Sequence, residues 1–518
     1  MFINTKEEVQ LVPNVMAENR CVVTLNKNVD TAEFCEQMTT TYGSDFIPNR
    51  NVELVNEKAD SISNFDFVLT EEEFQTLKSD PRVRDIRWGS KKENGFEPID
   101  FVLEEEKRYF RNSFQNALDY DWGKPACTTT GPRPSTFRHA YTLTGKNVDV
   151  IINDSGSYGV HPEFADADGN SRLIEYDWTQ HGGSQVAYSS YGSGHGVHVA
   201  GTALGKLYGW AKDANYYFCN YSNTGNGLNQ MRLFHQTKGN GLPTIVNQSW
   251  GYIGRYATSG AQYATTWRGT EYVVSTNQAQ YGQIRAVYDG FGYRFPSRIT
   301  SVDSDQEDLI AAGVIVVGAA GNYYHKIELP GGVDYDNNFQ TTSGGTRYYY
   351  HRGSSPVATP GTICVGSIDS QYQGASTEQI ATYTEVGPRI DVFAPGTHIQ
   401  SAIPVGSSIE TSYGGVAYPG NATYNSVKIS GTSMASPQVC GVLACLLEAR
   451  PHYTAADCLA WLQDNAVTDL LYDPTTGTPS TDYSNSRALQ GAPNYYLFNP
   501  FNREKSQSVT GDGFGFST

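Results

Sequence analysis

The sequence ISGTSMASPQVCGV occupies residues 429–442 and combines two signals. It places the hydroxyl of Ser433 between a Gly-Thr turn and an apolar run with helical spacing, which continues to Leu447 and must end before Pro451. Because the first backbone N–H groups of a helix have no partner within it, a side chain at this point lies beside open hydrogen-bond donors. The stretch therefore predicts a helix with a nucleophile at its N-terminus.

Three other motifs precede this helix in the chain. Asp154 follows NVDVIIN (147–153), whose β-branched residues predict a buried parallel strand, and a carboxylate at the end of such a strand can hold an imidazole in one tautomer. His195 lies in GHGVHVAGT, and Asn322 ends the run GAAGN. With GTSMASP around Ser433, these motifs resemble the Asp, His, Asn and Ser motifs of the subtilisin-like serine proteases, in the family's order, and the resemblance covers about residues 140–500.

This resemblance implies an α/β fold with a mostly parallel central sheet flanked by helices, and a serine endopeptidase. Ser433 would attack the scissile carbonyl, and His195, oriented by Asp154, would transfer the proton. Asn322 and the backbone N–H of Ser433 would stabilise the oxyanion. The order Asp, His, Ser excludes the chymotrypsin type, and the absence of GxSxG disfavours an α/β-hydrolase. Val197 departs from the family, which commonly has Thr at that position.

Two further segments resemble the borders of the family's substrate cleft. They are the loop NYSNTGNG (220–227), which contains Gly225, and the buried strand TIVNQSWG (244–251). An extended protein or peptide substrate is expected to add to their edges by backbone pairing, with one wall formed by Ser249, Trp250 and Gly251.

A group of small residues is expected to face that wall, namely Gly318, Ala319 and Ala320. Because small side chains leave space, they predict a roomy first pocket. The preferred substrate residue before the cut would then be large and apolar or aromatic.

Residues 1–90 predict a separate small α+β domain. CVVTL (21–25) and FDFVL (65–69) are strand-like, Thr70 begins a helix with a capping box, and VRDIRW (83–88) predicts a third strand. This order of elements resembles the inhibitory propeptide of the same family. We expect a propeptide-like partner within the chain, which packs against the catalytic domain and covers or borders the cleft. An accessory domain of unrelated role remains the alternative.

The remaining sequence divides into three parts. A polar connector is predicted at residues 91–138, and any maturation cut would fall within it. The catalytic domain is predicted at residues 139–502. Within that domain, residues 252–301 are an insertion rich in Tyr, Gly and Gln, expected to shape the cleft rim or to dock an assembly partner. Residues 503–518 predict a flexible tail.

Composition excludes several classes of partner. The chain of 518 residues has 54 Asp and Glu against 37 Lys and Arg, a net charge of -17, which argues against a nucleic-acid or an anionic-membrane partner. No stretch of ~20 apolar residues is present, and MFINTKEEVQ lacks the apolar core of a secretory signal. The eight cysteines form no CxxC pair, which favours reduced thiols. A cytoplasmic or virion-associated location is expected.

Neither metal motif that the sequence offers is convincing. Asp166, Asp168 and Asn170 alternate as in a calcium loop, but Gly169 occupies the fourth place where an EF-hand has Gly at the sixth. His195 and His198 are three residues apart and lack the HExxH pattern of zinc proteases. We expect no metal ligands and no cofactor, with calcium left open and without an assigned site.

Two other functions remain alternatives. A structural component, for example of a phage or virus particle, could carry the subtilisin-like domain in active or latent form. The presence of all four motifs argues against an inactive scaffold. An esterase could use the same triad, and comparing peptide with ester turnover would separate it from a peptidase.

Overall fold

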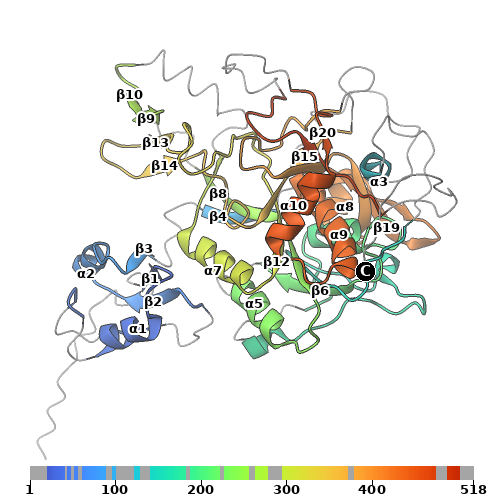
Figure 1. Cartoon of the computed structure of the whole chain (residues 1–518), viewed down its shortest axis with the longest axis horizontal. Helices are drawn as coiled ribbons and strands as arrows, with labels where there is room; N and C mark the ends of the chain where they lie inside the picture. The colour runs from blue at the N-terminus through green and yellow to red at the C-terminus, as the bar shows by residue number, and fades with distance from the viewer. Residues whose placement is uncertain are drawn as a thin grey trace, which may run out of the picture.

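The structure is a computed structural model of the chain, and it describes residues 20–40, 44–47, 52–55, 61–88, 96–100, 122–128, 141–181, 187–221, 227–255, 263–277, 294–370, 378–473 and 487–501. A small domain at the N-terminal end lies beside a larger body (Figure 1). The larger body contains the described residues between 141 and 501 and two earlier segments, residues 96–100 and 122–128.

An eight-stranded sheet forms the centre of the larger body (Figure 1). Its order is β20-β21-β16-β15-β12-β7-β5-β6, and all neighbouring strands are parallel except β20 and β21. Five central strands are buried at every position, because helices cover both faces of the sheet. This confirms the predicted α/β fold. The strands are β5 (Asp149–Asp154), β6 (Asn215–Asn220), β7 (Thr244–Gln248), β12 (Ile315–Ala319), β15 (Ile363–Ile368), β16 (Val392–Pro395), β20 (Val467–Thr468) and β21 (Tyr495–Tyr496).

Side chains alternate between the two faces of the sheet, so one strand contributes to two cores. Val150 and Ile152 of β5 belong to the large core that also contains residues of α4 and α9. Ile151, between them, belongs to the core that contains residues of α5 and α7. The helices around the sheet are α4 (His195–Leu204), α5 (Gly227–Thr237), α7 (Thr300–Ala311), α9 (Thr432–Ala449) and α10 (Ala455–Asn465).

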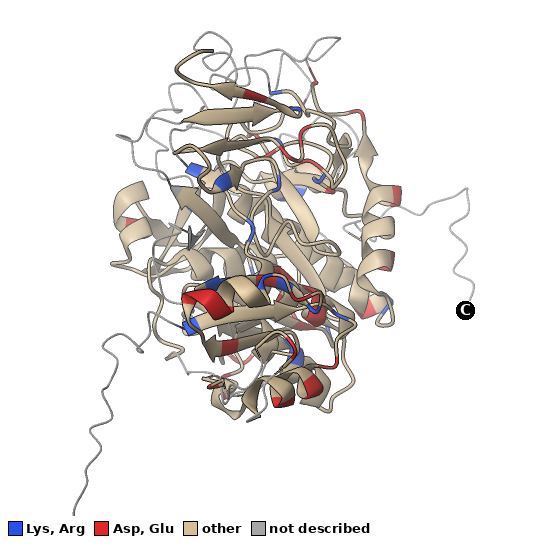
Figure 2. Cartoon of the chain, turned by 90° about the vertical axis from the view of Figure 1, so that its left-hand side faces the viewer, with Lys and Arg blue, Asp and Glu red and all other residues tan. Residues whose placement is uncertain are grey.

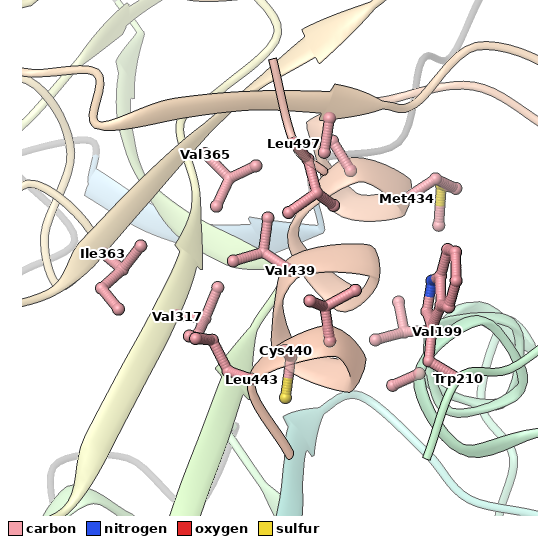
Figure 3. Close-up of a cluster of buried hydrophobic side chains, with 14 of the residues drawn as sticks. Val199, Trp210, Val317, Ile363, Val365, Met434, Val439, Cys440, Leu443 and Leu497 are labelled. Atoms are coloured by element: carbon pink, nitrogen blue, oxygen red, sulfur yellow. The ribbon is translucent and has the colours of Figure 1, made fainter. Parts of the chain in front are cut away.

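Helix α9 is the helix predicted from residues 429–442. Figure 3 shows Val439, Cys440 and Leu443 of α9 between the side chain of Val317 from the sheet and the indole of Trp210. All of its first 16 residues are buried. The N-terminus of this helix is therefore fixed by apolar packing on both sides of its axis.

The N-terminal domain has a three-stranded antiparallel sheet and a core of its own. The sheet order is β2-β1-β3, and Phe34 and Phe67 pack in its centre with ring centroids 6.3 Å apart. Thr70 and Glu73 form the expected capping box at the start of α2. The three predicted strands and the predicted helix are present as β1 (Arg20–Leu25), β2 (Asn64–Val68), β3 (Val83–Trp88) and α2 (Glu71–Leu77), together with a further helix, α1 (Thr31–Thr39).

The predicted polar connector is more than a linker in its described parts, β4 (Phe96–Asp100) and α3 (Gly123–Cys127). The indole N–H of Trp122 donates to the carbonyl of Thr397 at 2.7 Å, and the backbone of Asn499 donates to the carbonyl of Cys127 at 2.7 Å. Both Trp122 and Cys127 are buried in the large core. Apolar burial thus makes residues 122–128 part of the larger body.

Three smaller sheets surround the central one. Described parts of the predicted insertion pair with strands from elsewhere, in the orders β11-β8-β4 and β10-β9-β13-β14. The third sheet, β17-β19-β18, lies before α9 in the sequence. The elements are β8 (Trp250–Arg255), β9 (Ala264–Trp267), β10 (Thr270–Val273), β11 (Arg294–Pro296), β13 (Asn338–Gln340), β14 (Arg347–Tyr349), β17 (Ile399–Ile403), α8 (Ser408–Tyr413), β18 (Val416–Tyr418) and β19 (Asn421–Ile429).

Across the described residues, no helix has the length and apolar character needed to cross a membrane.

Candidate active site

Asp154 and His195 form the first half of the site. Asp154 is the last residue of β5, and His195 is the first residue of α4. The two side chains are fully buried, and Nδ1 of His195 lies 2.8 Å from Oδ1 of Asp154. A carboxylate at Nδ1 keeps the ring proton on that nitrogen, so the lone pair of Nε2 points away from Asp154. This is the tautomer that a general base needs.

A glycine permits this close approach of helix and strand. A Cβ at Gly196 would lie 2.2 Å from the carbonyl oxygen of Gly156 and 3.0 Å from Cβ of Asp154. Any side chain at this position would therefore push α4 away from β5. Gly194, which caps the helix, has a φ of 92° that also favours glycine.

Ser433 is the second residue of α9 and is fully buried. Its hydroxyl donates to the carbonyl oxygen of Ser249 at 2.8 Å, and the hydroxyl of Ser249 donates to the carbonyl of Ser433 at 3.0 Å. In this arrangement the proton of the Ser433 hydroxyl is therefore directed at the carbonyl oxygen of Ser249. No side chain caps the helix at Gly431, so the N–H of Ser433 is among the helix donors that lack an intrahelical acceptor.

Asn322 follows β12 and faces the start of α9. Its Oδ1 accepts hydrogen bonds from the backbone N–H and the hydroxyl of Thr432, both at 2.9 Å. These bonds fix the orientation of the amide, and they leave its buried Nδ2 group without a hydrogen-bond partner. A buried donor without an acceptor costs free energy, so its presence beside an open helix terminus indicates a site for an oxygen atom.

The predicted cleft wall lies at the beginning of β8. The indole of Trp250 donates to Oδ1 of Asn153 at 3.0 Å and stacks on Tyr221 with a centroid distance of 5.0 Å. Beside it lies a small pocket, partly open to solvent. Residues that line it include Leu228, Trp250, Tyr252, Val302 and Asp305.

The other predicted cleft residues have different environments. A Cβ at Gly318 would lie 2.6 Å from Cγ1 of Val357, Ala319 packs in a small core with Val357, and Ala320 belongs to the large core. Neighbouring side chains thus pack closely against these small residues, and the roomy first pocket stays a prediction. Gly225 lies outside the described residues.

Sequence reasoning missed two residues that touch the loop after β12. Thr432 orients Asn322, and its place inside the GTSMASP motif was a signal for this role. Glu385 lies 60 or more residues away in sequence and accepts hydrogen bonds from backbone N–H groups of that loop. Nothing in the local sequence around Glu385 distinguishes it from a surface residue.

The two candidate metal motifs have ordinary roles in the structure. Nε2 of His198 lies 3.0 Å from the carbonyl of Ile399, and burial lowers the pKa of this histidine to about 3. Oδ1 of Asp166 accepts from the backbone N–H groups of Asp168 and Asn170, which forms a closed polar turn. The described residues contain no cluster of His, Cys, Asp and Glu that could hold a metal ion. No disulfide joins any of the eight cysteines.

Polar side chains thus gather where the strands of a parallel sheet end, as is usual in α/β folds. Fervidolysin from Fervidobacterium pennivorans, a keratinolytic enzyme related to subtilisin, superposes with a TM-score of 0.51 over 92% of this chain and 60% of its own, at 20% identity. The fold is therefore of the subtilisin-like α/β class. The model of the subtilase family matches residues 145–494, and the chain belongs to that family.

The relatives have low sequence identity to this chain, and the matches cover only part of each protein. Subtilisin NAT of Bacillus subtilis subsp. natto is 28% identical over 336 residues, which are 64% of this chain and 63% of that protein. Proteinase R of Parengyodontium album is 26% identical over 63% of this chain and 60% of its own length. The cuticle-degrading protease of Metarhizium anisopliae is 25% identical over 73% and 70%, respectively.

Proposed function

We propose that this chain is a serine endopeptidase with the triad Asp154, His195 and Ser433. The observation that carries the proposal is the buried Nδ2 of Asn322, which has no partner and is held by Thr432 beside the open start of α9. Membership of the subtilase family supports protein or peptide substrates. No contact among the described residues favours the structural-component role.

The mechanism follows from the positions of these groups. The hydroxyl oxygen of Ser433 attacks the scissile carbonyl carbon while its proton passes to Nε2 of His195. Asp154 keeps the imidazole oriented and stabilises its positive charge. The carbonyl oxygen becomes an oxyanion, which accepts hydrogen bonds from Nδ2 of Asn322 and the N–H of Ser433. His195 then protonates the leaving amine, and water hydrolyses the acyl-enzyme by the reverse proton transfers.

We also propose that the N-terminal part of the same chain keeps this enzyme latent. Strand β4 pairs antiparallel with β8, with Ile99 opposite Gly251 and Asp100 opposite Trp250. It thus occupies the edge to which we expect an extended substrate to bind. All three triad side chains are fully buried in this arrangement.

Contacts with α7 support the same proposal. Lys27 donates to Asp308 at 2.7 Å, Asn64 donates to Asp305 at 2.8 Å, and Arg84 donates to Glu307 at 2.8 Å. The basic and amide groups come from the N-terminal domain, and the carboxylates come from the helix. Figure 2 looks onto this domain. The interface is therefore polar and charged, as expected for a partner that is released.

The register of β4 suggests which bond the enzyme cuts in its own chain. Asp100 is opposite Trp250, and the preceding residue, Ser249, accepts the hydrogen bond of Ser433. The end of β4 at Asp100 therefore lies one residue from the part of the opposite strand that binds the Ser433 hydroxyl. We therefore predict self-cleavage of the Phe101–Val102 bond. An aromatic residue before the cut also agrees with the preference predicted from the sequence.

The test follows the purified full-length chain by mass spectrometry over time, together with turnover of a peptide substrate. We expect Ser433→Ala to lower the peptidase rate about 10⁶-fold, the size known for the nucleophile of the relative subtilisin, and to abolish self-cleavage. The matched control is Ser408→Ala, the same change at an exposed serine. Peptidase activity retained in the Ser433→Ala variant would contradict the triad. An uncut chain as active as the cut one would contradict latency.

A further inference from the structure

The loop that carries Asn322, residues 321–325, is bound along its length to the segment 383–386. The backbone N–H of Tyr324 donates to the carbonyl of Tyr383 at 3.0 Å, and that of Glu385 donates to the carbonyl of Gly321 at 3.1 Å. The N–H of Val386 donates to the carbonyl of His325 at 3.0 Å. We call residues 321–325 the oxyanion loop. Its backbone is thus anchored on both sides of Asn322.

The side chain of Glu385 adds two more contacts to this loop. Oε1 accepts a hydrogen bond from the N–H of Tyr323 at 3.3 Å, and Oε2 accepts one from the N–H of His325. The residue is 1% exposed, and no described Lys or Arg pairs with its carboxylate. Burial raises the pKa of this carboxyl well above its ordinary value, and the two backbone hydrogen bonds oppose that rise. Burying a carboxyl group without a positively charged partner costs free energy of folding, so its presence here points to a specific role.

The aliphatic part of Glu385 also fixes the residue before Asn322. A Cβ at Gly321 would lie 2.8 Å from Cγ of Glu385, and the φ of Gly321 is 121°. Glu385 therefore packs against the backbone at Gly321 and binds the backbone at Tyr323 and His325. Asn322 lies between these points, and its own Oδ1 is held by Thr432.

We propose that Glu385 is a positioning residue of this active site, which acts through Asn322 by fixing the backbone on both sides of it. This inference rests on the proposed role of Asn322 as the oxyanion donor. The position of a donor matters because displacement by about 1 Å can cost a hundredfold in rate. A buried carboxylate suits this role, since its two oxygens can accept from two N–H groups at once.

The main experiment is Glu385→Gln in the full-length chain, with peptidase rates normalised to the active sites titrated by a serine-reactive inhibitor. Gln keeps the shape of the side chain but replaces one acceptor by an NH₂ group that faces a backbone N–H. We expect kcat to fall about tenfold, less than the 10²–10³-fold known for loss of the donor itself, while KM stays within about twofold. Glu385→Asp, which retains both acceptors, should recover part of the loss. An unchanged kcat in Glu385→Gln would overturn the proposal.

A double-mutant cycle with Asn322→Ala separates this inference from the proposed function. If Glu385 acts through Asn322, Glu385→Gln should lower kcat by a much smaller factor in the Asn322→Ala background than in the native chain. An equal fold decrease of kcat in both backgrounds would overturn the inference while leaving the role of Asn322 intact. If Asn322→Ala alone leaves kcat unchanged, the proposed oxyanion role fails, and the inference fails with it.

Glu163 offers a matched control for a purely structural effect. It is also a buried carboxylate that accepts backbone hydrogen bonds, from Leu207 at 2.9 Å and from Tyr208 at 2.6 Å. It does not contact the oxyanion loop. Glu163→Gln should lower the Tm and leave kcat per titrated site unchanged. If both variants lower kcat equally, Glu385 has no special role in positioning.

Discussion

Helices α9 and α7 both pack against the central sheet through apolar residues, but the second face of each helix makes different contacts. The first 16 residues of α9 are buried, and apolar side chains from the sheet and from α4 surround it (Figure 3). On α7, Asp305, Glu307 and Asp308 contact Asn64, Arg84 and Lys27 of the N-terminal domain. The helix that carries Ser433 is thus built into the large apolar core. The N-terminal domain contacts α7 through polar groups that water can replace.

This difference predicts how each helix responds to its surroundings. Apolar burial stabilises by roughly 25 cal/mol per Å² and does not depend on ionisation. Charged contacts weaken with salt and with changes of protonation. We therefore expect substitutions that shorten buried side chains of α9 to destabilise the whole fold. Changes of charge on α7 should affect mainly the docking of the N-terminal domain.

The largest effect is expected in α9. Leu443 is fully buried, and Leu443→Ala should lower the free energy of unfolding by about 2–5 kcal/mol, because a cavity remains in a packed core. Leu459→Ala on α10 is the matched control. Leu459 is only partly buried against the same core, so its substitution should lower the free energy of unfolding by less. Urea unfolding in the Ser433→Ala background, which avoids self-digestion, measures both. Equal losses would show that α9 is not the more tightly packed helix.

The positions of Asp154 and Ser433 in the fold could be predicted because each lies in a short motif with a clear local structure. A β-branched run placed Asp154 at the end of a strand, and an apolar run placed Ser433 at the start of a helix. In such stretches, neighbouring residues in the sequence determine the position of the functional group.

The features that were missed depend on contacts between distant parts of the chain. β4 pairs with β8 across about 150 residues, and the burial of Trp122 requires Thr397. The packing at Gly318 depends on Val357. No local pattern specifies such pairings, because tertiary contacts alone decide which partner fills a space.

Protonation of Asp305 should give the next largest effect. Burial raises its pKa from 3.8 to about 6, and hydrogen bonds from Ser61 and Asn64 oppose the rise. Asp308, on the next turn of α7, adds to the rise. We expect undocking to remove the contacts of Ser61 and Asn64, to expose this carboxyl and to return its pKa towards 3.8. Docking is then favoured below about pH 4, and this contribution is lost as the pH rises through about 6. The N-terminal domain should therefore be held more tightly at pH 5 than at pH 7.5.

Hydrogen exchange of the β2 and α7 amides in the uncut Ser433→Ala chain measures this change, after correction for the intrinsic pH dependence of exchange. Asp305→Asn keeps an oxygen that can accept from Ser61 and Asn64 but stays neutral at every pH. The variant should remain docked across the range. If it shows the same pH response as the native residue, another group is responsible. Amides of α9 in the same samples should not respond.

The smallest effect is expected from Arg84 and Glu307, which form two hydrogen bonds of 2.8 and 3.1 Å at the border of the same interface. Their side chains are 33% and 27% exposed, and exposed ion pairs contribute about 0–1 kcal/mol. A double-mutant cycle of Arg84→Ala and Glu307→Ala, read from exchange of β3 amides, should give a coupling within that range. About 0.5 M salt should reduce it, because the Debye length is then only about 4 Å. A coupling above about 2 kcal/mol that is insensitive to salt would contradict this expectation and would show that the pair behaves as a buried ion pair.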